Sequence, residues 1–200
     1  MTTSIDIDIS AYRQPEHDIE QLFVNRWSPR AMSGEVLSDT QLMALFEAAR
    51  WAPSSYNNQP WRFLYAKRDT VHWTPFFDLL IEGNQRWAKN AAVLVLIAST
   101  TRMESDGSAS RTYAFDCGAA WQNLALQATA QGLVAHGMQG FDYDKARDVL
   151  QIPDDHSVLA MVALGKPGRL EDLHERLRSR EQPSGRKNLS ELVLEGGFPK

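Results

Sequence analysis

Apolar residues recur at helical intervals over two long stretches of the chain. Ser38 and Gln41 have the spacing of a capping box, and the apolar positions that follow keep a helical period until Pro53. This pattern predicts a helix over residues 39–51. The second stretch, residues 111–131, is apolar almost all round, which is typical of a helix buried on several sides.

Two shorter helices are expected from their capping residues. Asp18 has the character of an N-cap for a helix that places Ile19, Leu22 and Phe23 on one face and ends near Arg26. Asp142 is expected to cap a helix that runs to about Leu150, ahead of Pro153. Gly132, Gly137 and Gly140 predict a loop before that second helix.

Three segments have the apolar pattern of strands: residues 61–66, 93–98 and 158–164. The longest uninterrupted apolar run, residues 91–98, is far shorter than the ~20 residues that a membrane-spanning helix needs, so no membrane association is expected. A few strands mixed with helices, without strict alternation, predict a layered α+β fold in a single domain over residues 1–200.

The two ends of the chain differ from the middle. Residues 1–17 are expected to form an irregular N-terminal extension, and they lack the positive start and apolar core of a signal peptide. Near the other end, Pro183, Ser184 and Gly185 interrupt the chain, and the tail beyond them is again apolar. Residues 183–200 are therefore expected to form an arm on the partner subunit of a homodimer, with packing on the arm's own domain as the open alternative.

Composition narrows the classes of partner. The chain has 200 residues, 43% hydrophobic and 23% charged, as in ordinary folded proteins, and its net charge of -4 argues against nucleic acid as a partner. A local group of cations could still bind a small phosphate. The single cysteine, Cys117, cannot form a disulfide within the chain, so a cytoplasmic location is expected.

Several common catalytic patterns are missing from the sequence. It contains no glycine-rich dinucleotide motif, no phosphate loop, no His-Glu-x-x-His zinc helix and no Gly-x-Ser-x-Gly elbow. The five histidines lack ligand spacing, so no metal is expected. A Ser, His and Asp group assembled only in space stays open. Otherwise, the chemistry of an enzyme built on this chain would belong to a cofactor.

Three separated segments combine polar groups with apolar anchors: residues 26–30, 52–61 and 184–187. The first and third carry four cations that could meet one dianionic phosphate, although solvated surface charge is the alternative for each: Arg26, Arg30, Arg186 and Lys187. The second holds a polar run, Ser54 to Asn58, before Gln59. Such a run can contact a heteroaromatic ring or simply form a turn.

These segments, together with residues 140–142, resemble the nitroreductase family in residues, order and spacing from about residue 18 to the C-terminus. The pairing of Ala-Pro-Ser-Ser with Gln-Pro-Trp is more specific than any single short motif. The resemblance implies an α+β, three-layer fold with a mostly antiparallel central sheet flanked by helices. It also implies an interwoven homodimer that binds FMN at two sites in its interface.

The resemblance further implies roles for individual residues. Arg26, Trp27, Ser28 and Arg30 would face the flavin phosphate and pyrimidine edge, and Arg186 and Lys187 would complete the phosphate site. Four residues would come largely from the other subunit: Ser54, Ser55, Asn57 and Gln59. Near the ring would lie Asn84, for which a loop position is the plain alternative, and a turn whose backbone N–H faces flavin N5: Met138, Gln139 and Gly140.

Two positions depart from the family pattern. Gln139 stands where many relatives have Glu, which a main-chain contact at N5 would tolerate. Trp87 stands where some relatives have a Lys near the flavin carbonyl. Without that Lys, Arg30 would be the cation that stabilises negative charge on the reduced ring.

The implied activity is that of an FMN-dependent oxidoreductase that uses NADH or NADPH. A small electron-poor acceptor such as a nitroaromatic, quinone, enal or enone would be reduced in a ping-pong cycle. No side chain is assigned as catalytic, because no protein nucleophile is needed. The alternatives are a flavin-fragmenting or dehalogenating relative on the same scaffold and a non-catalytic FMN-binding protein.

Overall fold

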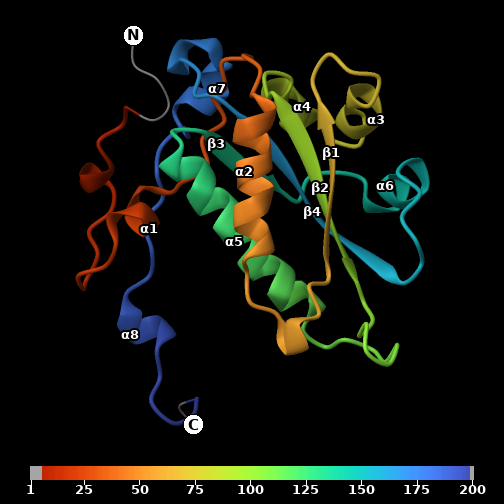
Figure 1. Cartoon of the computed structure of the whole chain (residues 1–200). Helices are drawn as coiled ribbons and strands as arrows, with labels where there is room; N and C mark the ends of the chain where they lie inside the picture. Colours follow the sequence, from red (N-terminus) through yellow and green to blue (C-terminus); the bar gives the residue numbers. More distant parts are fainter. Residues whose placement is uncertain (1–5, 199–200) are drawn as a thin grey trace.

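A four-stranded antiparallel sheet forms the centre of the molecule (Figure 1). The computed structural model describes residues 6–198. The strands are β1 (Trp61–Lys67), β2 (Val93–Thr100), β3 (Val134–Met138) and β4 (His156–Gly165), and their order in the sheet is β1-β2-β4-β3. Every neighbouring pair is antiparallel. The predicted α+β class and the antiparallel sheet are confirmed.

Strand β2 shows how the sheet is buried on both faces. Val93, Val95 and Ile97 pack into one hydrophobic core, and the alternate residues Leu94 and Leu96 pack into another. Successive strand side chains point to opposite faces, so an uninterrupted apolar run belongs to a strand that is covered on both sides. Helices complete the two outer layers of a three-layer fold.

Helices α2 (Asp39–Arg50) and α5 (Tyr113–Ala130) pack on each other and on one face of the sheet (Figure 1). The capping box of α2 is confirmed, because Ser38 Oγ accepts from the Gln41 amide and Gln41 Oε1 accepts from the Ser38 amide, both at 3.1 Å. Helix α5 was predicted to be buried on several sides, and its first turn is an exception. There the Phe115 side chain is 82% exposed.

Three short helices contribute to the core on the other face: α3 (Trp73–Phe77), α4 (Glu82–Ala88) and α6 (Tyr143–Val149). Helix α6 was predicted, and its Asp142 cap accepts from the Lys145 amide. Helices α3 and α4 were not predicted, because five to seven residues are too few to display a helical period. Their apolar side chains nevertheless pack into the core.

Two sequence predictions about local structure were wrong. Helix α1 (Gln21–Asn25) is shorter than the predicted helix that begins at Asp18, and its N-cap is Glu20 without a capping hydrogen bond. Residues 134–138 form β3 instead of the predicted glycine loop, because pairing with β4 outweighs the weak strand preference of Gly137. A side chain at Gly137 would approach the Trp121 ring to 3.2 Å.

The ends of the chain carry only short helical turns. The N-terminal extension includes η1 (Ile9–Ala11), and the charged stretch after β4 includes η3 (Leu170–Asp172) and α7 (Glu175–Arg178). Beyond them the chain leads into an arm, residues 183–198, that contains α8 (Leu189–Leu192) and projects from the body (Figure 1). Among the described residues, every helix is too short or too polar to cross a bilayer.

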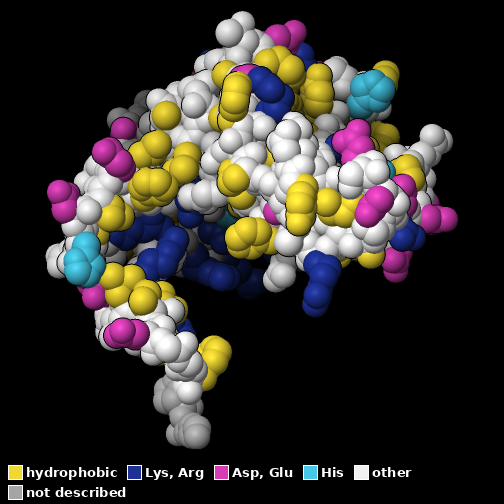
Figure 2. All heavy atoms as spheres, turned by 60° about the horizontal axis from the view of Figure 1, so that its bottom comes forward, with side chains coloured by type: hydrophobic (Ala, Val, Ile, Leu, Met, Phe, Trp, Pro, Cys, Tyr) yellow, Lys and Arg dark blue, Asp and Glu magenta, His cyan; other side chains and the backbone are white. Residues whose placement is uncertain are grey.

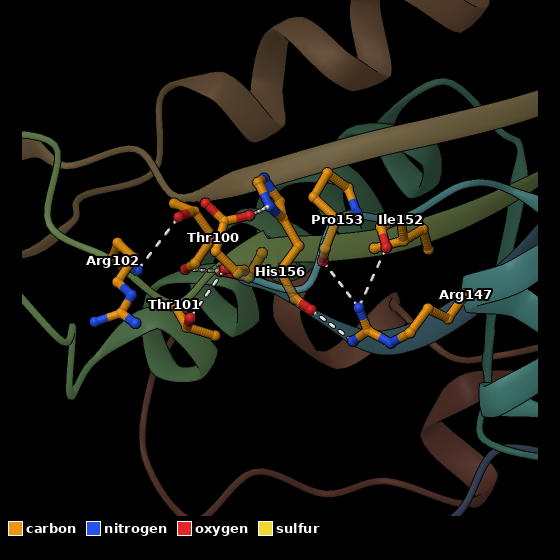
Figure 3. A network of polar contacts seen from close by, with 9 residues as sticks. Thr100, Thr101, Arg102, Arg147, Ile152, Pro153 and His156 are labelled. Carbon is orange, nitrogen blue, oxygen red and sulfur yellow. Dashed lines mark hydrogen bonds and ion pairs between the residues drawn. The ribbon is translucent and has the colours of Figure 1, made fainter. Parts of the chain in front are cut away.

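A polar network closes the turn between α6 and β4 (Figure 3). The Arg147 guanidinium donates to the carbonyls of Pro153 at 2.8 Å and His156 at 2.7 Å. On the adjoining strand end, Thr101 donates to the Asp155 carbonyl through both its amide and its hydroxyl. Because its donors point at backbone oxygens, Arg147 fixes the start of β4 and is a structural cation.

Candidate functional site

Three arginines from distant parts of the chain act on one another electrostatically. Burial lowers the pKa of Arg26, and the charge of Arg186 lowers it further. The pKa of Arg13 is lowered by burial and then by the charges of Arg186 and Arg26. Lys and Arg side chains gather in a hollow between the arm and the body (Figure 2). Like charges held together in this way are typical of a site for an anion.

The local backbone presents two of these arginines beside hydroxyl groups. Arg26 ends α1 with an extended backbone, and its Nη1 donates to Ser28 Oγ at 3.2 Å. Arg186 donates to Ser184 Oγ at 3.1 Å. A groove of about 490 Å³ between residues 12–24 and 185–192 is lined by Arg13, Arg186 and Lys187. The structure thus brings Arg26 and Ser28 near the segment that carries Arg186 and Lys187.

Arg30 differs from Arg26 because it has a buried carboxylate partner. Glu181 Oε1 accepts from the backbone amides of Arg30 at 2.5 Å and Ala31 at 2.8 Å, and its Oε2 lies 3.5 Å from Arg30 Nη1. The Glu181 side chain is fully buried. Glu181 was not predicted as a site residue, because nothing in the sequence distinguishes it from the other acids in the charged stretch 169–181.

His136 holds the preceding residues against the sheet. Its Nδ1 lies 2.9 Å from the Pro29 carbonyl, and its ring centroid lies 4.6 Å from that of the buried Trp87. Burial is the main cause that lowers the pKa of His136 to about 4. The ring is therefore neutral near pH 7, with Nδ1–H donating to Pro29, and it anchors the segment that carries the buried Trp27.

The depressed pKa of His136 makes the protein less stable in mild acid. Its folded-state pKa of about 4 lies below the ordinary value of 6.5, so the unfolded chain binds the proton first as the pH falls. We expect the free energy of unfolding to drop by about 2–3 kcal/mol on this account between pH 6.5 and pH 4. Urea denaturation at several pH values across that range measures this change in the free energy of unfolding.

Two variants isolate that contribution. His136→Asn keeps a neutral donor without titrating in this range, so its unfolding free energy should lose this part of the pH dependence. His72→Asn, at an exposed histidine, is the matched control and should follow the wild type. The same pH dependence in His136→Asn and the wild type would contradict the assignment.

The polar turn after α2 has an unusual backbone. It contains η2 (Ser55–Asn57), and Tyr56, Asn57 and Gln59 all have positive φ, at 50°, 55° and 45°. Side chains rarely accept this left-handed region unless the surroundings impose it. The Gln59 amide donates to Ser54 Oγ at 3.0 Å, which closes the turn.

Two buried polar residues hold this turn in place. Asp116 Oδ2, in the first turn of α5, accepts from the Ser55 amide at 3.2 Å. The Asn58 side chain donates to the Arg102 carbonyl at 3.0 Å and accepts from the Glu104 amide at 2.8 Å. Neither residue was among the predicted site residues. An acid at position 116, inside an otherwise apolar helical pattern, is the sequence signal that could have identified one of them.

The polar turn and the arginines are not brought together within one chain. The turn lies at the foot of α2, well away from α1 and the segment that follows it (Figure 1). Ser54, Ser55, Asn57 and Gln59 therefore form one half of the predicted site, and the cations form the other.

A third group of predicted residues meets at the end of β3. Asn84 lies on α4, so the loop alternative was wrong, and its Nδ2 donates to the Gly140 carbonyl at 3.0 Å. A Cβ atom on Gly140 would lie 2.7 Å from Ile81 Cδ1 and 2.8 Å from Asn84 Nδ2, so a larger residue there would displace the Asn84 amide. Met138 is buried and Gln139 is exposed. Asn84 and the 138–140 turn are thus neighbours.

Other chemistry has little support in residues 6–198. That part of the chain contains no group of three or more His, Cys, Asp or Glu residues placed to hold a metal ion. Cys117 is buried, and burial raises the pKa of its thiol, which opposes the thiolate that a nucleophile requires.

An antiparallel sheet between two helical layers defines an α+β protein. The model of the nitroreductase family matches residues 24–166. This chain belongs to the nitroreductase family, and the resemblance seen in its sequence is confirmed.

Individual relatives agree with this membership. A crystal structure described as an oxidoreductase containing FMN matches with a TM-score of 0.90 and 42% identity, covering 100% of this chain and 99% of that one. Protein DrgA of Synechocystis is 30% identical over 164 residues, which cover 68% of this chain and 76% of the relative. An Archaeoglobus fulgidus protein whose name combines NADH dehydrogenase with NAD(P)H nitroreductase is 25% identical, covering 78% of this chain and 88% of the relative.

Proposed function

We propose that this protein is an FMN-dependent oxidoreductase that uses NADH or NADPH to reduce a small electron-poor acceptor. The observation that carries the proposal is the pairing of Arg26 with Arg186, two cations from opposite ends of the chain. Arg13 donates to the carbonyls of Arg26 and Ser184, and the pKa of Arg26 is lowered by burial and then by the charge of Arg186. A dianionic phosphate relieves such repulsion. The full-length similarity to an oxidoreductase containing FMN supports FMN as its carrier.

The residues present fit FMN at both of its ends. Arg26, Ser28, Arg186 and Lys187 would hold the phosphate, and the turn near Asn84 would lie against the ring. The polar turn supplies further hydrogen-bonding groups, and its left-handed backbone is held rigidly by Asp116 and Asn58. Rigid polar groups beside apolar walls suit the recognition of a planar heterocycle.

The proposed site needs two copies of the chain. Because the polar turn lies away from the arginines of its own chain, the turn of a second subunit would complete each site. Large apolar side chains support an interface on this side of the molecule, since Trp51 is 71%, Tyr56 93% and Phe115 82% exposed. The arm carries further exposed apolar residues, including Leu192, Val193 and Phe198, which we propose pack on the partner.

In the proposed ping-pong cycle, FMN held by these residues would supply the redox chemistry between the nicotinamide and the acceptor. The chain's own residues would bind the cofactor and orient it. Arg30 would place a positive charge near the electron-rich ring, and Glu181 would keep that side chain in position. No protein nucleophile is required. The single buried cysteine agrees with a reducing compartment, so the proposal includes a cytoplasmic location.

Anaerobic absorption spectroscopy of the purified protein tests this function. We expect a yellow homodimer that releases FMN on denaturation and whose flavin band bleaches on mixing with NADH or NADPH. A nitroaromatic or a quinone should then restore the band. A bound flavin that neither nicotinamide bleaches would contradict the oxidoreductase and favour a flavin-binding protein without turnover.

A further inference from the structure

Arg13 joins two backbone segments at the proposed phosphate site through three carbonyl groups. Its Nη1 donates to the carbonyls of Val24 at 2.7 Å and Arg26 at 2.8 Å, at the end of α1. Its Nε donates to the Ser184 carbonyl at 2.9 Å, at the base of the arm. One planar guanidinium thus connects the backbone of Arg26 with that of Ser184, two residues before Arg186.

A further hydrogen bond joins the N-terminal extension to the arm on the other side of Arg186. The Leu189 amide donates to Glu16 Oε1 at 2.9 Å. Residues 13–16 therefore contact the arm at Ser184 and at Leu189, and Arg186 lies between these two contacts. The N-terminal extension, which the sequence predicted only as irregular, makes a specific connection to the arm.

This connection opposes an electrostatic repulsion. Arg26 and Arg186 carry like charges, and their repulsion favours separation of the arm from the body when no anion is present. Arg13 is itself a cation that these two arginines repel, but three carbonyl oxygens accept hydrogen bonds from its guanidinium, which therefore holds the two backbone segments together. The nitroreductase family model matches residues 24–166 only, so Arg13, Glu16 and Arg186 all lie outside the matched part.

We propose that Arg13 is a positioning residue of the anion site, which ties the end of α1 to the base of the arm and so holds Arg26 and Arg186 together before the anion binds. The identification of this anion as the FMN phosphate rests on the proposed function. The connection that Arg13 makes between α1 and the arm is independent of the proposed function.

Charge and geometry can be separated with two variants at position 13. Arg13→Lys keeps the positive charge but loses the planar fork that reaches three carbonyls, and Arg13→Ala loses both. Glu16→Ala removes the second contact without removing a cation, and Glu20→Ala is its matched control on the same exposed segment. The full-length chain is used throughout, and thermal unfolding checks that each variant is folded.

Two measurements are made on the FMN-depleted protein. The first is the rate of trypsin cleavage after Arg186 and Lys187, followed by mass spectrometry, and the second is the dissociation constant of added FMN. We expect Arg13→Ala and Arg13→Lys each to raise the cleavage rate and the dissociation constant about ten-fold, as for loss of charge-assisted hydrogen bonds. Glu16→Ala should produce smaller increases in both, and Glu20→Ala none.

The outcomes are distinguishable. Wild-type behaviour of Arg13→Lys in both measurements would show that only the charge matters and would overturn the proposal. An unchanged cleavage rate in Arg13→Ala would also overturn it. If the wild type binds no FMN, the proposed function fails, while the cleavage rates still decide whether Arg13 and Glu16 hold the arm.

Discussion

Replacing Arg26 with alanine is expected to weaken FMN binding about 10- to 100-fold, because a hydrogen bond to a charged group contributes about 1.5–3 kcal/mol. Arg26 is partly buried whereas Arg186 is exposed, and the pKa of Arg26 is lowered by burial and by the charge of Arg186. Because Arg26 stays protonated despite this repulsion, its charge interacts strongly and favourably with a bound anion. Titration of the FMN-depleted protein, followed by quenching of flavin fluorescence, measures the change.

The other members of the site refine this expectation. Arg186→Ala should weaken FMN binding by a smaller factor, because Arg186 is exposed and its interactions are screened by solvent. Arg26→Lys should recover part of the loss, since charge remains but the fork does not. Arg176→Ala, on the exposed surface of α7, is the control and should bind FMN as the wild type does. Unchanged affinity in both Arg26→Ala and Arg186→Ala would exclude this phosphate site.

Loss of the Glu181 carboxylate is expected to destabilise the protein strongly. Alanine at this position leaves the amides of Arg30 and Ala31 without their acceptor and leaves the Arg30 side chain without its ion-pair partner. Removing one member of a buried charged pair costs about 3–5 kcal/mol. Because Arg30 is partly exposed, we expect about 3 kcal/mol in the free energy of unfolding, measured from urea midpoints at constant m-value.

Glutamine separates hydrogen bonding from charge at this position. Glu181→Gln retains an acceptor oxygen for the two amides, so it should lose about half as much stability as Glu181→Ala. Glu175→Ala, at an exposed position of α7, is the control and should change stability little. If Glu181→Ala denatures at the same urea concentration as the wild type, the carboxylate does not hold residues 30–31.

Local patterns predicted the long elements well and the short ones poorly. The cap of α2, the span of α5 and three of the four strands follow from periodicity and from residues adjacent in sequence. Strand β3 does not, because its structure depends on pairing with β4, where Gly137 faces Val162. Helices α3 and α4 form because their apolar residues, among them Phe76 and Trp87, fill the core beneath the sheet.

The amino-acid sequence alone determined the fold class, the family and the arginines, serines and amides proposed for the cofactor. Only the tertiary structure revealed the residues that hold them: Arg13, whose partner Ser184 is 171 positions away; Glu181, which is 150 positions from Ala31; and His136, which is 107 positions from Pro29. Motifs consist of residues close in sequence. The Glu181 carboxylate, the His136 imidazole and the Arg13 guanidinium are instead placed by distant backbone groups that the folded chain brings within hydrogen-bonding distance.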